Sequence, residues 1–432
     1  FVGITACSAP KETDKTTAGV NSSQPISEET TVDQSTALKQ GQKQKLETVS
    51  FDPNGEPKYH FEEIKHFSEL DPSNFLDEWK EGHFLLAVTP DDFYAFKGEK
   101  ENFREGLSPF TLASYNLKDN ELTALEPVSD PDYFIRLAWA DESRLVWVEV
   151  TNSAVTQDTG WKLMTKHLPD GSSQSLLDVK YDEASREKRP PVDLFPESMV
   201  VQGNRAFLIY PAYEKQNWNS VVAYVDLENG RETVLEKTAL DQVVHAQLSL
   251  EKEAGKAVIW NRLSEVNQEE GARTAFKVCA ICSWTPDSAT DYRTVAEEGY
   301  DLSPLQYGDR YYAVEPETNP PHPDQPKDVI VEIQGDQKKT LIEHELSTLS
   351  DRDSAFSLFD LVGNKRFMGA LQSAGLPVLY EPAAGKLVEV SDYKVEPGQD
   401  YRLVQIFDHH AIFRLPGDDG ETGNFSIVHL PE

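Results

Sequence analysis

Short runs of apolar or alternating residues, separated by turn residues, fill the chain from about residue 58 to its end. Turn residues interrupt the runs at a spacing of roughly 8–14 positions, which is typical of an all-β chain with many short strands. Amphipathic helical periodicity is weak throughout, and only residues 66–80 suggest a helical turn or two. The pattern therefore predicts an all-β fold.

The turns recur with a longer period, and four strand-like runs can be placed around each of them. Steps of about 48–59 residues separate successive turns, close to the period of a propeller blade. The turns are Asp119-Asn120, Asp170-Gly171, Asn229-Gly230, Asp287-Ser288, Gly335-Asp336 and Ala384-Gly385. We predict a β-propeller of seven four-stranded blades over residues 58–432, the first beginning at His83–Val88. Six or eight blades, or two β-sandwich domains, are the alternatives.

The last repeat supplies three strands, up to Asn424–Leu430, and lacks a fourth. The alternating segment Lys58–Ile64 precedes the first repeat without a partner of its own. We expect it to form the outer strand of the last blade and so close the ring, because an open array would expose a sheet edge at each end.

The segment Leu137–Trp147 (LAWADESRLVW) resembles the repeat of TolB-like propellers, in which an aromatic strand meets a tight acidic turn and a second apolar strand. Gln247–Trp260 resembles it more weakly. The resemblance extends over residues 58–432 mainly as strand order. It implies a propeller fold and a cell-envelope setting, and it carries over no catalytic residue.

Ile4-Thr5-Ala6-Cys7 resembles the lipobox of bacterial lipoproteins. The resemblance implies that residues 1–7 are the remnant of a signal peptide, with a diacylglycerol on Cys7 that holds the protein on the extracytoplasmic side of a bacterial membrane. Residues 8–57 are rich in Ser, Thr, Gln, Lys and Glu and lack periodicity, which predicts a flexible tether. The alternative is a disordered tail with an incidental cysteine.

The charge narrows the classes of partner. Lys and Arg number 41 against 74 Asp and Glu, giving a net charge of −33. This disfavours binding to nucleic acid or to anionic lipid through a basic patch. Self-repulsion favours a monomer at low salt. No apolar run reaches the length of about 20 residues that a spanning helix needs.

The loops between second and third predicted strands are long and acidic, and they include 97–109, 211–219, 262–274 and 315–327. Function concentrates in loops on a rigid scaffold. Carboxylates and aromatic rings attract cationic or polyhydroxylated partners. The candidate binding-face residues are Phe103, Glu105, Tyr213, Trp218, Glu270 and Asp324. The alternative is that such loops are ordinary propeller surface.

Possible metal or redox motifs have simpler interpretations. Cys279 and Cys282 lie in a strand-like run whose geometry separates i and i+3 by about 10 Å, so we predict unbridged packing cysteines. His409 and His410 are predicted to be a turn-and-strand pair, and Gly417–Asn424 a hairpin loop. The sequence predicts no metal and no cofactor.

The chain contains no GxSxG, P-loop, GxGxxG or HExxH motif. We therefore predict a non-enzymatic propeller that binds a protein, a peptide or a cell-envelope polymer. The alternative is a carbohydrate-active enzyme, a glycosidase or lyase, using dispersed carboxylates near the central channel. Channel-facing acids with raised pKa values would favour the enzyme, and an apolar plug would favour the binder.

Overall fold

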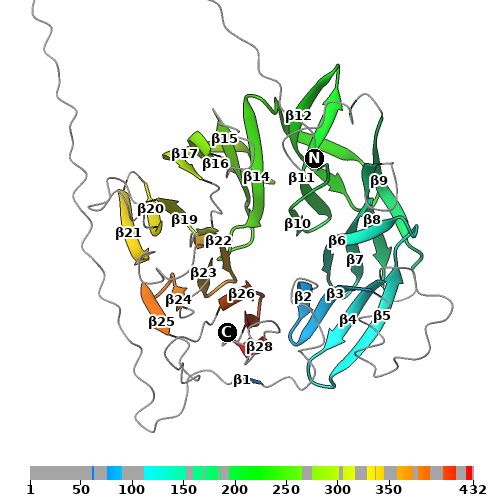
Figure 1. The fold of residues 1–432 in the computed structure, drawn as a ribbon, viewed down its shortest axis with the longest axis horizontal. Helices are drawn as coiled ribbons and strands as arrows, with labels where there is room; N and C mark the ends of the chain where they lie inside the picture. The colour runs from blue at the N-terminus through cyan, green and yellow to red at the C-terminus, as the bar shows by residue number, and fades with distance from the viewer. Residues whose placement is uncertain are drawn as a thin grey trace, which may run out of the picture. The chain divides into compact units, whose positions relative to one another are not determined.

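The computed structural model describes residues 61–62, 75–89, 111–151, 159–168, 171–182, 185, 194–264, 275–300, 305–316, 328–335, 337–344, 358–372, 378–389, 402–414 and 425–430. Within these residues every element is a strand, and 28 strands form seven antiparallel four-stranded sheets arranged in a ring (Figure 1). The fold is a seven-bladed β-propeller, as the turn period predicts, and the alternative of two sandwiches is wrong.

We number the blades by the order of their innermost strands. Blades 1 and 2 consist of β2 (Phe75–Lys80), β3 (His83–Val88), β4 (Thr111–Asn116) and β5 (Glu121–Pro127), then β6 (Tyr133–Ala140), β7 (Arg144–Thr151), β8 (Thr159–His167) and β9 (Gln174–Tyr181). Blades 3 and 4 consist of β10 (Met199–Gln202), β11 (Arg205–Glu214), β12 (Asn217–Asp226) and β13 (Glu232–Ala239), then β14 (Val243–Leu250), β15 (Val258–Ser264), β16 (Ala275–Thr285) and β17 (Ser288–Tyr300).

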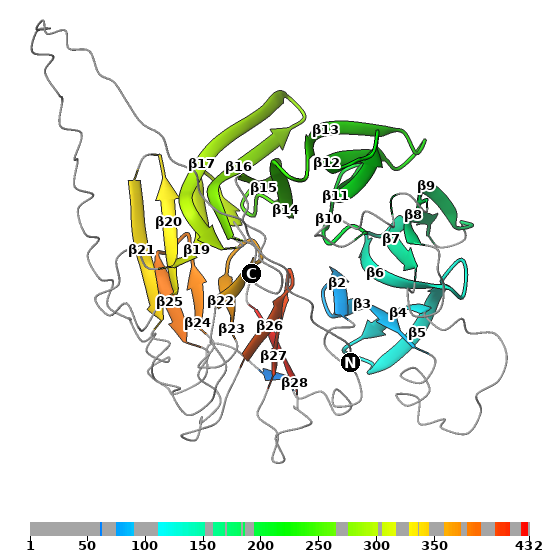
Figure 2. The same ribbon diagram turned by 45° about the horizontal axis from the view of Figure 1, so that its top comes forward.

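Blades 5 and 6 follow the same order (Figure 2). They consist of β18 (Leu305–Tyr307), β19 (Arg310–Pro316), β20 (Asp328–Gln334) and β21 (Gln337–His344), then β22 (Leu358–Gly363), β23 (Met368–Gln372), β24 (Val378–Glu381) and β25 (Lys386–Glu389). Blade 7 consists of β26 (Arg402–Ile406), β27 (His410–Arg414), β28 (Phe425–His429) and β1 (Phe61–Glu62).

The core lies between the blades, because both faces of each sheet are covered. On β7, Leu145 and Trp147 pack toward blade 1, whereas Val146, Val148 and Val150 pack toward blade 3. Alternate side chains of a strand point to opposite faces. The sequence of a strand covered on both faces is therefore a continuous apolar run. Apolar clusters of this kind lie at all seven junctions, including the junction of blade 7 with blade 1.

The first blade differs from its prediction. Phe75–Lys80, at the end of the segment expected to be helical, forms the innermost strand β2, so His83–Val88 is the second strand of the blade. Register shifts between Phe75 and Asp77 and between Glu78 and Lys80 disturb the alternation of β2. Such bulges break the period of two, which explains the misleading pattern.

The outermost strand of blade 7 is β1, where Phe61 pairs with Val428 and Glu62 with Ile427. These are the only residues of the segment 58–64 that the structure describes, so closure of the ring by the whole segment stays a prediction. Cys7, the lipobox and the predicted tether lie outside the described residues. Within the described residues no helix has the length and apolar character needed to cross a membrane.

Candidate functional site

Among the described residues, hydrogen bonds join six of the seven pairs of neighbouring blades at one end of the ring, where turns connect the first and second strands. We call this set the belt. Its donor and acceptor pairs are Arg144 with Asn204, Gln202 with Gly255, Lys252 with Gln306, Tyr307 with Phe367, Asn364 with Phe407, and His409 with Glu78. The belt fixes the turns of all seven blades relative to one another.

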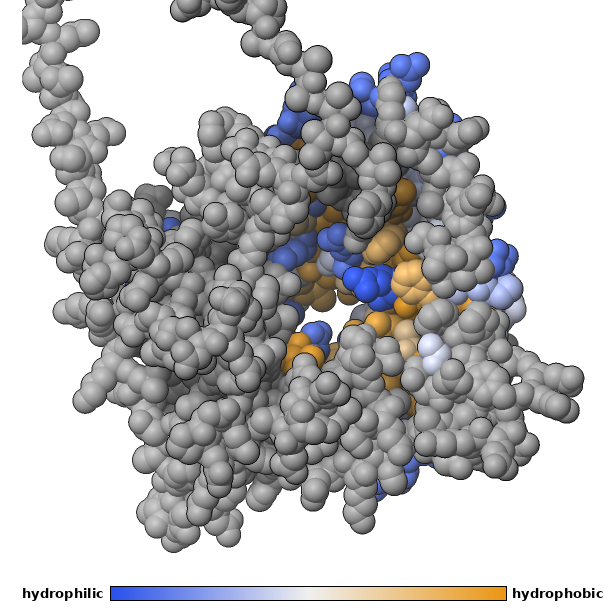
Figure 3. All heavy atoms as spheres, in the orientation of Figure 1, coloured by the Kyte–Doolittle hydropathy of each residue, from blue (hydrophilic) through white to orange (hydrophobic). Residues whose placement is uncertain are grey.

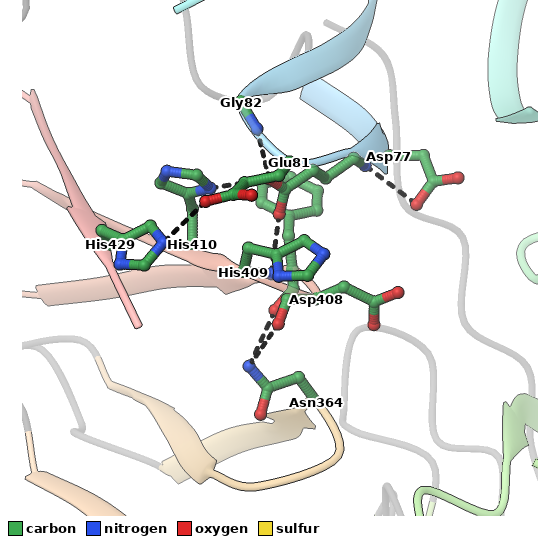
Figure 4. Close-up of polar contacts among 10 residues, drawn as sticks. Asp77, Glu81, Gly82, Asn364, Asp408, His409, His410 and His429 are labelled. Carbon is green, nitrogen blue, oxygen red and sulfur yellow. Dashed lines mark hydrogen bonds and ion pairs between the residues drawn. The ribbon is translucent and has the colours of Figure 1, made fainter. Parts of the chain in front are cut away.

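The junction between blades 7 and 1, which we call the seam, has the most elaborate of these links (Figure 4). The amide of His409 donates to Oε2 of Glu78 at 2.9 Å, and Nδ1 of His410 lies 2.6 Å from Oε1. The amide of Gly82 donates to Oε1 at 2.9 Å. Because an ionised carboxylate only accepts hydrogen bonds, Nδ1 of His410 carries the proton in this contact.

The Glu78–His410 pair is enclosed by apolar side chains. Glu78 is 5% exposed and His410 is 3% exposed. The ring of Phe84 lies 5.3 Å from that of Phe407 and 5.5 Å from that of His410, in edge-on contacts. Burial acts to raise the pKa of Glu78, but hydrogen bonding and charge from His410, together with the two amides, outweigh it and lower the pKa. Glu78 is therefore held as a carboxylate.

The residues next to this pair carry two further carboxylates. Asp77 precedes Glu78 on β2, and Asp408 lies in the turn between β26 and β27. Figure 4 shows the two carboxylates on the same side, pointing away from the strands of blade 7. Burial raises the pKa of Asp77 to about 7, and the charge of Asp408 adds to the rise. Surrounding protein displaces most water from Asp77, although part of its surface stays accessible.

A lysine approaches the same space from the far side of the ring. Lys252 lies in the turn between β14 and β15 of blade 4, which in a ring of seven is opposite the seam. Burial lowers the pKa of Lys252, and the charges of Asp408 and Asp77 oppose this effect. Among the described residues, no ion pair within 4.0 Å joins Lys252 to either carboxylate. Charges of opposite sign thus face one another across a gap.

A space-filling view shows a hollow at the middle of the ring, with both hydrophilic and hydrophobic residues on its described wall (Figure 3). The hollow is not closed by an apolar plug on this face. Asp77, Asp408 and Lys252 form what we call the channel site. Its two acids and one base suit a ligand that carries an ammonium group beside an anionic or polar group.

The predicted binding-face residues fall into two groups. Phe103, Glu105, Glu270 and Asp324 lie outside the described residues. Tyr213 and Trp218 belong to a regular hairpin rather than to the expected loop 211–219, because β11 and β12 continue to a two-residue turn at Lys215 and Gln216 with φ of 49° and 69°. Their role in binding stays a prediction.

Packing of these two rings is partly structural. Tyr213 and Trp218 are cross-strand partners whose rings lie 5.1 Å apart. Trp218 also packs against the apolar clusters on both sides of the hairpin. Both side chains are half-buried, so part of each ring remains accessible on this hairpin.

The histidine and cysteine motifs lie where the sequence predicts them. His409 is in a turn and His410 begins β27. The CxxC lies in β16, and Cys282 is a buried free thiol. The side chain of Cys279 and all of Gly417–Asn424 lie outside the described residues. The described part of the chain holds no group of three or more His, Cys, Asp or Glu suited to a metal ion.

A second His–Glu pair lies at the junction of blades 3 and 4. Nε2 of His245 is 3.2 Å from Oε2 of Glu236, and its Nδ1 is 2.9 Å from the hydroxyl of Ser220. The arrangement of Ser220, His245 and Glu236 resembles a hydrolytic triad. However, Ser220 is only 3% exposed, and its hydroxyl also accepts a hydrogen bond from the amide of His245. Because a substrate needs access to the nucleophile, we interpret this cluster as structural.

Sequence reasoning missed the channel site. Asp77, Lys252 and Asp408 come from three blades and share no spacing. The available signal was weak: an Asp-Glu pair inside the apolar run FLDEWK, and an acid before the His-His pair in a first-to-second-strand turn. Both had other interpretations, as a helical turn and as an ordinary strand entry.

No family model and no curated protein sequence matches this chain. Solved propellers are similar in fold. An acylaminoacyl peptidase of Pyrococcus horikoshii aligns with a TM-score of 0.46 and 12% identity over 82% of this chain and 50% of its own, so this chain spans about half the length of that enzyme.

Two further structures align over most of their own length. The β-propeller domain of the Trilobed protease from Pyrococcus furiosus, described as having an open velcro topology, gives a TM-score of 0.46 and 11% identity over 80% of this chain and 89% of its own. YCF48 bound to a D1 peptide aligns with a TM-score of 0.46 and 12% identity over 90% of this chain and 98% of its own. At these identities the similarity concerns the fold alone.

Proposed function

We propose that this chain is a ligand-binding β-propeller of the bacterial cell envelope, and that its ligand binds at the channel site. The single observation that supports this is the arrangement of Asp77, Asp408 and Lys252. They come from three blades, and the charges of both carboxylates act on Lys252 without closing into an ion pair. A purely structural ion pair closes to contact, because desolvated charges are costly when they are left apart.

The chemistry of the site favours a ligand with separated charges. Two carboxylates on the seam side complement an ammonium group, and Lys252 on the opposite side complements a carboxylate or a polar oxygen. A peptide with a free amino terminus and an amino-sugar polymer of the cell envelope both offer an ammonium group. The net charge of −33 draws cationic groups toward the whole molecule.

Calorimetric titration with defined probes tests this proposal. Trialanine should bind, and N-acetylation of the peptide should weaken binding about tenfold or more, since one charge-assisted contact is lost. Asp408→Asn should weaken trialanine binding. Amidation of the C-terminus of trialanine should weaken binding to the wild type. Lys252→Met should weaken binding of trialanine and should also reduce the loss that amidation causes. Titration with chitosan oligomers tests binding of the amino-sugar class of ligand. Absence of binding for both probe classes, or binding that ignores Asp408→Asn, would overturn the proposal.

The envelope location rests on the lipobox resemblance at Cys7 and on the polar composition of residues 8–57. Such a segment would hold the propeller away from the membrane, because a flexible chain of about 50 residues spans roughly 35–42 Å. The partner on this side is membrane lipid, bound through acylated Cys7.

One observation favours a carbohydrate-active enzyme as the second candidate. Asp77, with a pKa raised to about 7, lies beside a second carboxylate, Asp408. Glycoside cleavage uses one protonated acid and one ionised carboxylate, with their environments tuned differently. A reducing-end assay on cell-wall polysaccharides tests it. If the wild type releases product and Asp77→Asn does not, although it still binds the substrate, the protein is a carbohydrate-active enzyme. If no substrate yields product, this second candidate is excluded.

A further inference from the structure

We propose that the Glu78–His410 pair is a clasp that closes the seam and thereby holds the two carboxylates of the channel site together. Closed, the clasp keeps Asp77 and Asp408 on one side of the hollow. Open, it separates them and removes ligand binding. This inference rests on the proposed function for its second part, and the first part stands without it.

The seam brings the two ends of the chain together. β1, the outer strand of blade 7, leads along the chain to β2 of blade 1, whereas β26, β27 and β28 come from the C-terminal end. Glu78 and His410 are accordingly 332 positions apart. The described contacts across the seam are the apolar cluster around Phe84 and Phe407, the Glu78 contacts, and Glu81 with His429. Strands β26–β28 are therefore held against blade 1 by these contacts and by the pairing of β28 with β1.

Glu78 lies where its contacts would transmit motion to the site. It accepts from His409 and His410 of blade 7 and from Gly82 of its own blade. Its neighbour on the strand is Asp77, and the neighbour of His409 in the turn is Asp408. The amide of Glu78 donates to Oδ1 of Asp77 at 2.9 Å. A shift of Glu78 relative to His410 thus moves both site carboxylates.

The turn that carries Asp408 is also held from the other side. Nδ2 of Asn364 in blade 6 donates to the carbonyls of Phe407 and Asp408, at 3.0 Å each. Opening of the seam would therefore leave Asp408 with blade 7 and blade 6, while Asp77 moves with blade 1. This is why the clasp controls the distance between the two carboxylates.

Several other charged or titratable groups face the clasp from the elements around it. They are Asp77, Lys80 and Glu81 of β2 and its turn, His83 of β3, Asp408 and His409 of the β26–β27 turn, His429 of β28, and Lys252 of the β14–β15 turn. Because the pKa of Glu78 is lowered in the folded protein, the clasp is complete above the ordinary glutamate value of 4.5 and is lost as the pH falls through the lowered value.

Hydrogen–deuterium exchange of the ligand-free protein tests the clasp directly. In Glu78→Gln, amides of β2, β3, β27 and β28 should exchange about tenfold faster or more, because loss of the buried carboxylate shared by an imidazole and two amides costs at least the free energy of a tenfold change. Amides of β11 and β12, across the ring, should be unchanged. The matched control is His245→Gln, which breaks the His–Glu pair at the junction of blades 3 and 4, where the two partners lie close together in the chain.

Wild-type protein provides a second measurement that does not depend on a variant. As the pH falls below 4.5, exchange corrected for its intrinsic rate should rise at the seam strands before it rises in β11 and β12. Uniform exchange across the blades, in both Glu78→Gln and acidified wild type, would overturn the clasp. His245→Gln opening the seam as strongly as Glu78→Gln would also overturn it.

Trialanine titration of the same variants separates the two proposals. If wild type binds and Glu78→Gln loses about tenfold in affinity while His245→Gln does not, the clasp controls the site. If Glu78→Gln opens the seam but wild type does not bind, the proposed function fails and the clasp stands. If Glu78→Gln binds as wild type does, the coupling of clasp and site is wrong.

Discussion

Oε1 of Glu78 and Nδ1 of His410 lie 2.6 Å apart, although one residue belongs to the first blade and the other to the last. Both are buried, so each depends on the other for compensation of its desolvation. Loss of either partner therefore leaves a buried polar group at the seam without that compensation.

Replacement of Glu78 by Gln should lower the free energy of unfolding by about 1–3 kcal/mol, because it removes the buried charged acceptor that the imidazole of His410 and two amides share. The matched control is Glu81→Gln, which affects the exposed pair with His429 and should cost less than about 1 kcal/mol. Urea unfolding of both variants measures the difference. Equal losses would contradict the assignment of the buried pair.

Replacement of Asp77 by Asn should stabilise the protein increasingly as the pH rises. The pKa of Asp77 is about 7 in the folded chain and 3.8 ordinarily, so the folded state retains a proton that the unfolded state has lost. The wild type thus loses stability between about pH 4 and pH 7, and the variant does not. The melting temperatures of both proteins at pH 5 and pH 8 test this. A difference that is independent of pH would show that Asp77 titrates normally.

Replacement of Lys252 by Met should raise the melting temperature at neutral pH. Burial lowers the pKa of Lys252, so the folded state resists its charged form, and the cost is present wherever the lysine is protonated in the unfolded chain. Above about pH 10.5 the gain should vanish. Exposed Lys256, in the same turn, is the control, and its replacement by Met should have little effect. A fall in the melting temperature of Lys252→Met would show that attraction to the carboxylates outweighs burial.

Deletion of residues 58–64 should leave β28 as an unpaired edge, because Phe61 and Glu62 are its outer partners. Exposed edges promote association between chains. We expect a lower melting temperature and a concentration-dependent rise in mass by light scattering. A deletion of the same length within 8–57 should have neither effect. Retention of the monomer and of the melting temperature would argue against closure by this segment.

Labelling with a radioactive fatty acid in a bacterial host tests the anchor. The full precursor should incorporate label, and Cys7→Ala should not, because the thioether forms on that sulfur. Cys282→Ala, which alters a buried thiol, is the control and should label as wild type does. Labelling that persists in Cys7→Ala would defeat the lipoprotein proposal.

Much of the fold was predictable because blades repeat. Turns such as Asn229-Gly230 recur with the blade period, and strands such as Arg144–Thr151 carry apolar residues on both faces. The first blade escaped the prediction because bulges in β2 break the period of two, and Phe75, Leu76 and Trp79 are spaced as in a helical turn. Local irregularity removed the signal where the seam is built.

The channel site was less predictable for a geometric reason. Asp77 and Lys252 are 175 positions apart, and no local pattern states that blade 4 lies opposite the seam. Their roles depend on desolvation, which arises only after the ring has formed. The acidic loops were visible in sequence because charge is local information. The interaction of Asp77, whose pKa is raised, with Lys252 from a distant part of the chain was not visible in the sequence.

The ring of blades also has a mechanical consequence. Its seven junctions, each with an apolar cluster, follow one another around a closed circle. An outward load on the rim is therefore carried as hoop tension, and every junction bears the same force. The load at which the ring opens is then set by the weakest junction, and strengthening the other six would not raise it.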